Sequence, residues 1–290
     1  MSVFSALDTA VSGLASQSHA FTDIGNNIAN SQTTGYKSTN TTFADYVLNS
    51  SSLEGNSATT VARTQQNTQA QGTITASTNA LALAISGNGF FNVVQSSSNS
   101  GGTTTFNNTQ LYTRDGNFTE NNQGYLVNDA GNYLEGYVSD ANGNLQTDAP
   151  RPINVANIAY RPAPTDAPGA AAPNFTGVSM TSDGSVMASF DNGKTQMVAR
   201  IPLASFADAN ALNAVNGQAY SATNASGAAS MGYADSGVNG GLETSSIEGS
   251  TTNLDSDLTK LIVAQQAYGA NAKVVSTANE MLQTTLAMKQ

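Results

Sequence analysis

The two ends of the chain repeat apolar residues with a helical period, whereas the long middle repeats them with the period of a strand. At both ends the seam positions alternate between spacings of three and four, which is the heptad pattern of a helix with one buried face. The N-terminal seam runs through Phe4, Leu7, Val11, Leu14, Ser18, Phe21, Gly25 and Ile28. The C-terminal seam runs through Leu254, Leu258, Leu261, Gln265, Tyr268, Ala272, Val275, Asn279, Leu282 and Leu286. We therefore predict a long helix at each end.

The two predicted helices carry more apolar surface than one pair can bury. An antiparallel pair covers one stripe on each helix, and residues such as Ile24, Ile262 and Met281 lie off the seams. The alternative, a globular helical bundle, is weakened because no further helical segment is visible between the ends. We expect the ends to pair as an antiparallel coiled coil that packs against further copies, since isolated helices are marginal in water. Asn253 or Thr252 can cap the second helix.

The middle of the chain has a period of two, with turn signals between short apolar runs. The candidate strands are Gly72–Ser77, Leu81–Ser86, Phe90–Gln95, Leu111–Arg114, Tyr125–Asn128, Tyr133–Ser139, Ser185–Phe190, Gln196–Pro202 and Gln218–Ala222. Pairs of a residue followed by glycine separate these strands, and the glycine supplies the positive φ of a tight hairpin. The glycines of these X-Gly pairs are Gly116, Gly124, Gly131, Gly143, Gly184, Gly193 and Gly217. The expected fold is α+β, with a central antiparallel β domain.

These patterns divide the chain into four regions. Residues 1–30 and 251–290 form the predicted helical domain, and residues 31–71 read as an extended polar connector. Residues 72–160 and 174–250 form the predicted β domain. Residues 161–173 hold four prolines and are predicted to be a link within it.

Charge and composition exclude several classes of function. The formal net charge of −10 and the scattered basic residues argue against binding nucleic acid. The chain has no cysteine, so disulfides and thiolate metal sites are excluded. No segment reaches the roughly 20 consecutive apolar residues that span a bilayer. The N-terminus is no cleavable signal peptide, because its first basic residue is Lys37. With its Asn-, Thr- and Gly-rich composition, the chain is expected to be extracellular and exported without such a signal.

The sequence holds no convincing active site. His19 is the only histidine and sits in the N-terminal helix, where a surface or interface role is expected. The stretch from Asp140 to Asn144 resembles half of a calcium loop, but no glutamate closes it, and an Asx-Gly turn explains it better. Gly87 and Gly89 precede two phenylalanines, not the helix of a dinucleotide site. We predict no enzyme activity, no metal and no cofactor.

The stretch NNIANSQTTGYK, which follows the first helix, carries a more specific signal. It resembles the Asn-rich exit, ending in T-x-G-[YF]-K, of bacterial flagellar rod and hook proteins. Three further stretches are similar to the same family: LALAISGNGFFNVV, LYTRDGNFTENNQGYLVNDAGNYLEGY, and the tail from Leu242 to Thr284. The matching residues of the signature turn are Asn27, Asn30, Thr33 or Thr34, Gly35, Tyr36 and Lys37. Gly35 is the best candidate there for a positive φ.

Within that family, residues 182–212 and the FADYV run after the signature turn are most similar to hook subunits. Hook subunits usually insert a larger outer β domain after the region that matches Pro152–Tyr160, and here only the proline-rich link stands there. The resemblance therefore implies a hook subunit with a reduced outer domain. A distal rod subunit is the alternative, and a secreted β-rich adhesin is a more remote one.

The resemblance also implies partners and a place of assembly. Family members leave the cell unfolded through the flagellar export apparatus and polymerise at the distal tip, with paired terminal helices lining a central channel. Expected neighbours are further copies of the chain, the distal rod protein, the hook-capping protein and the hook–filament junction protein. We expect interface roles for the apolar seam residues of both helices, and a shaping role in the exit turn for Asn27, Asn30, Thr34, Gly35, Tyr36 and Lys37.

Overall fold

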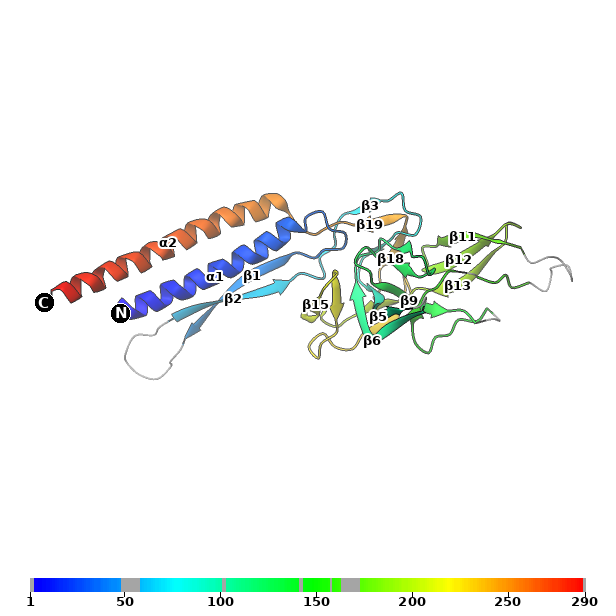
Figure 1. Ribbon diagram of the computed structural model, residues 1–290, viewed down its shortest axis with the longest axis horizontal. Helices are drawn as coiled ribbons and strands as arrows, with labels where there is room; N and C mark the ends of the chain where they lie inside the picture. The colour runs from blue at the N-terminus through cyan, green and yellow to red at the C-terminus, as the bar shows by residue number, and fades with distance from the viewer. Residues whose placement is uncertain are drawn as a thin grey trace. The chain divides into compact units, whose positions relative to one another are not determined.

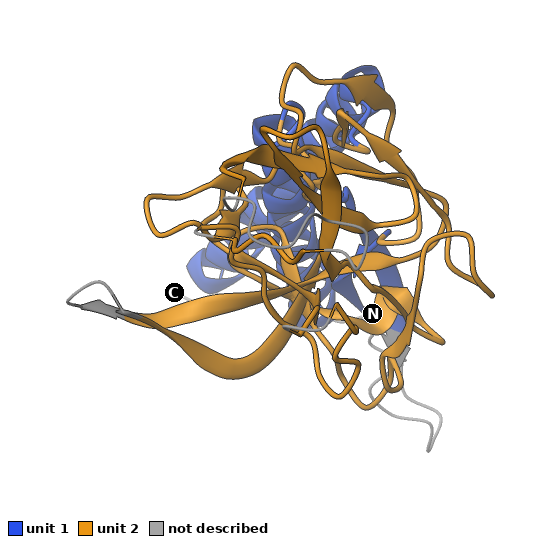
Figure 2. Cartoon of the chain, turned by 90° about the vertical axis from the view of Figure 1, so that its right-hand side faces the viewer, with its two compact units in different colours: residues 1–32, 37–67, 252–290 blue, residues 33–36, 68–251 orange. Residues whose placement is uncertain are grey.

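The computed structural model describes residues 3–47, 58–100, 103–140, 143–156, 158–162 and 173–288. The chain divides into two compact units, coloured separately in Figure 2. Unit 1 comprises residues 1–32, 37–67 and 252–290, and unit 2 comprises residues 33–36 and 68–251. The chain therefore passes from one unit to the other four times, and both of its ends belong to unit 1.

Unit 1 contains both predicted helices, α1 (Val3–Ala29) and α2 (Leu254–Ala287). They run side by side in opposite directions (Figure 1). Asn253 caps α2, because its side chain accepts a hydrogen bond from the backbone N–H of Ser256 at 3.0 Å. Among the described residues, no helix is long and apolar enough to cross a membrane. The antiparallel pairing of the ends is present, and supercoiling into a coiled coil stays a prediction.

The region expected to be an extended connector, residues 31–71, instead contains a regular hairpin, so that prediction was wrong. Strand β1 (Thr39–Val47) pairs with β2 (Ala58–Gln66) in an unbroken antiparallel register from Thr39 opposite Gln66 to Val47 opposite Ala58. The hairpin belongs to unit 1 and packs on α1. The hairpin has no clear apolar period because threonine, asparagine and glutamine fill half of its strand positions.

Unit 2 is built from antiparallel strands. Its strands are β3 (Ile74–Ala76), β4 (Leu83–Ser86), β5 (Phe90–Ser100), β6 (Thr103–Thr113), β7 (Thr119–Glu120), β8 (Leu126–Val127), β9 (Tyr133–Val138), β10 (Arg151–Pro152), β11 (Phe175–Met180), β12 (Ser185–Phe190), β13 (Thr195–Arg200), β14 (Leu203–Ser205), β15 (Asn213–Val215), β16 (Ala219–Ser221), β17 (Ser230–Gly232), β18 (Gly241–Thr244) and β19 (Ser246–Glu248), with a short 3-10 helix at Ala209–Ala211. Strands β5 to β17 join in one 13-stranded sheet whose main path is β11-β12-β13-β9-β5-β6-β16-β15. Each of the nine segments predicted as strands overlaps an observed strand, so the α+β class is confirmed.

Glycines form the hairpin turns of unit 2, as the X-Gly pairs predicted. The glycines of six of the seven pairs have a positive φ, between 77° and 88°. Gly116 is the exception. A Cβ at Gly116 would run into the carbonyl oxygen of Leu83, so this glycine is required by close backbone approach and not by its φ.

The core of unit 2 lies on both faces of strand β5. Phe91 and Val93 point into the larger cluster, with Leu83, Ile85, Phe118, Leu126, Leu134, Ile153, Val186, Ile201 and Leu203 among its other members. Phe90 points the opposite way, into a smaller cluster with Tyr112, Leu212 and Tyr220. Consecutive buried residues are the pattern of a central strand covered on both sides. This core makes unit 2 a self-contained β domain.

Two small sheets tie the ends of unit 2 together. Strand β4 pairs with β18, and β3 pairs with β19, so residues that enter the β domain lie beside residues that leave it. Most of the proline-rich link, residues 163–172, lies outside the described residues. The strands on either side of it, β10 and β11, both belong to the large sheet.

Candidate assembly surfaces

The two helices approach closely near the middle of their contact. The rings of Phe21 and Tyr268, both predicted seam residues, lie 6.0 Å apart between centroids. Gly13 faces Asn271, and a Cβ added to Gly13 would lie 2.6 Å from Asn271 Nδ2. A glycine at this point allows the helix backbones to come together. The structure therefore brings Phe21 of the first predicted seam into contact with Tyr268 of the second, whereas Gly13 and Asn271 lie outside both seams.

The inner face of α2 is shifted in phase from the predicted seam. In one predicted column Leu261, Val275 and Leu282 are part-buried and Tyr268 contacts α1, whereas Leu254 of the same column is exposed. The second column consists of Asp257, Ala264 and Ala278, which are the buried residues of α2. The residues predicted for that column were Leu258, Gln265, Ala272, Asn279 and Leu286, and all five are exposed. Small and polar residues therefore occupy the second column, and Leu258 is displaced outward.

The buried face of α1 also differs from its predicted seam. Leu7, Leu14, Phe21 and Ile28 are part-buried, but Phe4 and Val11 are exposed. The buried residues of α1 are Ala10, Ser16, Ala20, Asp23, Ile24 and Asn27. These residues include three polar side chains because α1 is covered on a second side by the hairpin β1–β2. Helix α1 thus packs against α2 on one side and against a polar strand on another.

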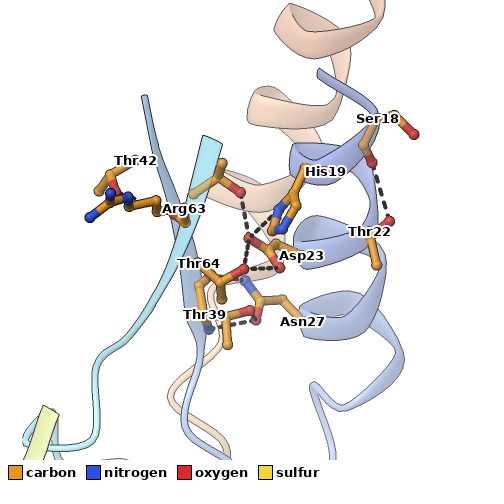
Figure 3. Close-up of polar contacts among 10 residues, drawn as sticks. Ser18, His19, Thr22, Asp23, Asn27, Thr39, Thr42, Arg63 and Thr64 are labelled. Atoms are coloured by element: carbon orange, nitrogen blue, oxygen red, sulfur yellow. Dashed lines mark hydrogen bonds and ion pairs between the residues drawn. The ribbon is translucent and has the colours of Figure 1, made fainter. Parts of the chain in front are cut away.

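Polar side chains fasten α1 to the hairpin, as Figure 3 shows. Asn27 Nδ2 donates to the carbonyl of Thr39 at 2.8 Å, and the backbone N–H of Thr39 donates back to Asn27 Oδ1 at 2.9 Å. The carboxylate of Asp23 accepts hydrogen bonds from the hydroxyls of Thr41 and Thr64, so it holds both strands. Asp23 and Asn27 are buried away from water, so these hydrogen bonds satisfy polar groups that would otherwise have no partner. The role of Asp23 was not predicted, and its i,i+4 spacing from Asn27 was the one available sign.

The signature turn is held inside unit 2. Gly35 has a φ of +69°, as expected of it, and its N–H donates to the carbonyl of Glu248 at 2.8 Å. The carbonyl of Tyr36 accepts from the N–H of Thr251 at 3.1 Å. A Cβ at Gly35 would lie 2.5 Å from the backbone nitrogen of Asp115. Three of the stretches that resemble the family therefore meet at one point.

The remaining residues of the signature have different environments. Asn30 closes the end of α1, since its Nδ2 and its backbone N–H both donate to the carbonyl of Asn26. Asn27 faces the hairpin as described above. Thr34 is part-buried, and the side chain of Lys37 is fully buried. The signature thus specifies buried and hydrogen-bonded positions and not an exposed recognition motif.

A buried ion pair lies beside this turn. Arg114 Nη1 is 3.3 Å from Glu248 Oε2, and neither side chain is more than 2% exposed. Arg114 also donates to the carbonyl of Gly87 at 2.8 Å, while Glu248 Oε1 accepts from the N–H of Gly72 at 2.7 Å. Burial lowers the pKa of Arg114, and the facing carboxylate of Glu248 acts in the opposite direction. The pair joins strand β19 to the loop that follows β6.

Two further carboxyl groups are buried in unit 2. Burial raises the pKa of Asp115 to about 6 and the pKa of Glu135 to about 7. Within the described residues, no group of three or more His, Asp or Glu side chains is placed to hold a metal ion. His19 Nδ1 lies 3.6 Å from Asp23 Oδ2, a carboxylate already engaged by two threonines. At Asp140 the carboxylate accepts from the N–H of Asn144, which is the turn chemistry expected.

Many apolar side chains of α2 are exposed in unit 1. They are Leu254, Leu258, Ile262, Val263, Tyr268, Val274, Met281, Leu286 and Met288, of which Tyr268 also contacts α1. Exposed apolar surface of this extent on a helix is typical of a surface that contacts another protein. Ile262 and Met281 belong to the off-seam apolar surface expected from the sequence, whereas Leu254, Leu258, Tyr268 and Leu286 were predicted to lie in the seam.

Three family models match the chain in successive parts. Residues 7–37 match the flagella basal body rod protein model, and residues 84–188 match the D1 domain of the flagellar hook protein FlgE/F/G. Residues 243–288 match the C-terminal region of the flagellar basal body rod FlgEFG proteins. These segments contain α1 with the signature turn, the strands around β5 and β9, and α2.

Curated relatives include both rod and hook proteins. The basal-body rod protein FlgG of Caulobacter vibrioides is 31% identical over 97% of this chain and 97% of its own length. The hook protein FlgE of the same species is 40% identical over 42% of this chain, and the match spans only 21% of that hook protein. The hook protein FlgE of Brucella suis aligns over the whole of both chains at 26% identity, across 407 positions. With the contacts of the signature turn, these matches show that the chain belongs to the family of flagellar hook and basal-body rod proteins.

Proposed function

We propose that this protein is a structural subunit of the bacterial flagellar hook, which polymerises into a curved helical tube that transmits torque from rod to filament. The observation that carries the proposal is the uncovered apolar outer surface of α2, on a chain whose family builds the flagellar axis. Such a surface is costly for an isolated chain and is covered when copies pack together. The tube needs heterologous contacts, in which one surface meets a different surface of the next copy, so that the assembly stays open.

The proposal gives each unit a task. In the assembled tube, α1 and α2 supercoil as an antiparallel coiled coil and line the inner wall, with their seam residues as the interface. Unit 2 has its own hydrophobic core, so it folds without a partner and its surface is free to supply the outer contacts between copies. No catalytic step belongs to this function. The neighbours are the export apparatus, the distal rod protein, the hook-capping protein and the hook–filament junction protein, and the site of action is outside the cell.

The choice of hook over rod rests on local similarity. Segments of about two fifths of the chain are 40% identical to the hook proteins of Caulobacter vibrioides and Helicobacter pylori. Residues 182–212, which hold β12, β13 and β14, are the part of the sequence that most resembles hook subunits.

A distal rod subunit is the second candidate, and chain length favours it. The alignment with the Caulobacter rod protein takes 297 positions, close to the 290 residues of this chain. The alignment with the Brucella hook protein takes 407 positions, so at least 117 of them (407 − 290) have no counterpart here. That hook protein therefore contains additional residues that this chain lacks.

Electron microscopy of basal bodies from a deletion strain tests the proposal. If the chain is a hook subunit, the mutant keeps complete rods and lacks hooks, and the purified protein forms curved tubes. If it is a rod subunit, the mutant lacks the distal rod and the tubes are straight. Normal hooks and rods in the mutant would contradict both candidates.

A further inference from the structure

A groove runs along unit 1 between α1, α2 and strand β1. Its cavity volume is about 400 Å³. Ala20 and Ala264, both buried, are part of its lining, and Phe43 of β1 and Val263 of α2 line it as well. Phe43 is 49% exposed and Val263 is 61% exposed, so both present apolar surface to solvent. These four residues provide part of its apolar surface, and polar residues, among them the buried Asp23 and Asn27, line the groove too.

One buried polar atom in the groove has no partner. Asp257, only 3% exposed, lines the groove, and its Oδ2 accepts no hydrogen bond. Its other oxygen accepts from Lys260 Nζ at 3.2 Å, and the same ammonium donates to Asn40 at 3.2 Å. An unsatisfied buried acceptor costs about 1–3 kcal/mol. The groove is thus complementary to an apolar surface that also brings one hydrogen-bond donor.

The chain itself carries such a surface on the first turns of α2. Leu254, Leu258 and Ile262 follow one another at a spacing of four and are all exposed. Gln265 falls on the same face at the next step and is exposed as well. We call these four residues the α2 stripe. It has no charged member, and the side-chain amide of Gln265 is a hydrogen-bond donor.

The α2 stripe and the groove lie on different sides of the same helix. Val263 follows Leu258 by five residues, which is a rotation of about 140° around an α-helix. The stripe of one copy therefore cannot occupy its own groove. When it occupies the groove of a second copy, the second copy's stripe remains free for a third. A contact of this kind is heterologous, so it repeats from copy to copy and builds an open helix when the rotation between copies does not close.

We propose that the groove between α1, α2 and β1 receives the α2 stripe of a second copy of this chain, with Gln265 donating to the unpartnered oxygen of Asp257. This inference rests on the proposed function, because it names the contact that joins successive subunits. It assigns the outward leucines of α2 to a specific complementary surface. It also assigns the hairpin β1–β2 a function, since without β1 the groove has no second wall.

Cysteine cross-linking between two different variants tests this pairing. The natural chain has no cysteine, so each introduced thiol is unique. A full-length Val263→Cys chain bearing a size tag is mixed with an untagged Leu258→Cys chain, concentrated, and oxidised with copper phenanthroline. Each disulfide forms as two thiols give two electrons to the copper oxidant and two protons to solvent. Leu254→Cys and Ile262→Cys repeat the test at the other stripe positions.

The expected product is the mixed disulfide between a Val263→Cys chain and a stripe variant, with both self-linked products absent. Lys273→Cys serves as the control, because it is equally exposed on α2 but about 22 Å along the helix from Leu258. This control chain is expected to give no mixed product.

Electron microscopy of the same samples separates this inference from the proposed function. Tubes without mixed disulfides, or with the stripe variants linked only to themselves, overturn the groove pairing and leave the proposed function standing. Mixed disulfides without tubes support the pairing and count against a tube-forming subunit. A sample with neither tubes nor mixed disulfides overturns both.

Discussion

The guanidinium of Arg114 and the carboxylate of Glu248 lie 3.3 Å apart although 134 residues separate them in the chain, and both are buried. Glu248 also binds the backbone of the signature turn, since its carbonyl accepts from the N–H of Gly35. Residues from the beginning, middle and end of the sequence thus meet around one ion pair. Residues 33–36 and 248–251 therefore meet within unit 2.

Loss of one partner of this pair is expected to destabilise the β domain strongly. Glu248→Ala leaves the Arg114 charge buried and unpaired, which costs about 3–5 kcal/mol. Urea unfolding of the full chain measures the change. The more exposed pair of Asp183 and Arg200, 3.9 Å apart, provides the control. Asp183→Asn removes the charge but keeps an acceptor for the hydroxyls of Thr181 and Ser185, and it is expected to cost about 1 kcal/mol or less. Equal effects of the two substitutions would contradict the structural role of the buried pair.

Two glycine substitutions are expected to separate the cost of a steric clash from the cost of a positive φ. Gly35→Ala adds the cost of a positive φ and also a clash with the backbone of Asp115. Gly193→Ala is matched to it, because Gly193 has a φ of +77° but a Cβ added there would meet no atom within 4 Å. We expect about 1–2 kcal/mol for Gly193→Ala from backbone strain alone, and a larger loss for Gly35→Ala. Thermal unfolding of both variants measures the difference, and an equal loss in each would show that the contact with Asp115 is unimportant.

The stability of unit 2 is expected to depend on pH through its buried carboxyl groups. Glu135 has a folded pKa raised by burial from 4.5 to about 7, and Asp115 has one raised from 3.8 to about 6. Between about pH 4 and pH 7 the folded state binds more protons than the unfolded state. The contribution of these two groups to the free energy of unfolding is therefore lost as the pH rises through this range. Glu135→Gln should remove part of this decline, measured by urea unfolding at several pH values. The exposed Glu120→Gln should leave the profile unchanged, and a wild-type slope in Glu135→Gln would exclude Glu135 as a source.

The hairpin β1–β2 is expected to loosen when its acceptor on α1 is removed. Asp23→Ala deprives the hydroxyls of Thr41 and Thr64 of their partner, at a cost of about 1–3 kcal/mol. Hydrogen exchange of the β1 amides should become faster. Thr22→Ala is the control, because its hydroxyl bonds only to the carbonyl of Ser18 on an exposed side of α1 (Figure 3). Unchanged exchange in Asp23→Ala would mean that backbone and apolar contacts alone hold the hairpin.

A charge in the helix seam is expected to abolish polymerisation while the β domain stays folded. Leu261 is on the inner face of α2, and Leu261→Asp would place an unpaired carboxylate in a desolvated contact at a cost of several kcal/mol. Leu14→Asp tests the same contact from α1. Electron microscopy shows whether tubes form, and near-ultraviolet circular dichroism reports the fold of unit 2. The exposed Gln283→Asp should assemble normally, and tubes formed by Leu261→Asp would falsify this account of the seam.

Local sequence determined the types of the main elements. Heptad spacing placed α1 and α2, the alternation of apolar residues placed strands such as β5 and β9, and X-Gly pairs placed the hairpin turns. These features depend on residues close together in the chain, so their signals survive in the sequence without a partner. The positive φ of Gly35 could be predicted for the same reason.

Only the tertiary structure decided which faces are buried. In α2, Leu261, Val275 and Leu282 of one predicted column are part-buried, but the second column is Asp257, Ala264 and Ala278, because small and polar residues fit the close contact with α1. The hairpin β1–β2 was missed because Asp23 and Asn27 hold it through hydrogen bonds, which leave no apolar period. Arg114 and Glu248 gave no sign of their pairing. The spacing of apolar residues is a property of neighbours in the sequence. The burial of a side chain depends on residues that are distant in the chain and that only folding brings together.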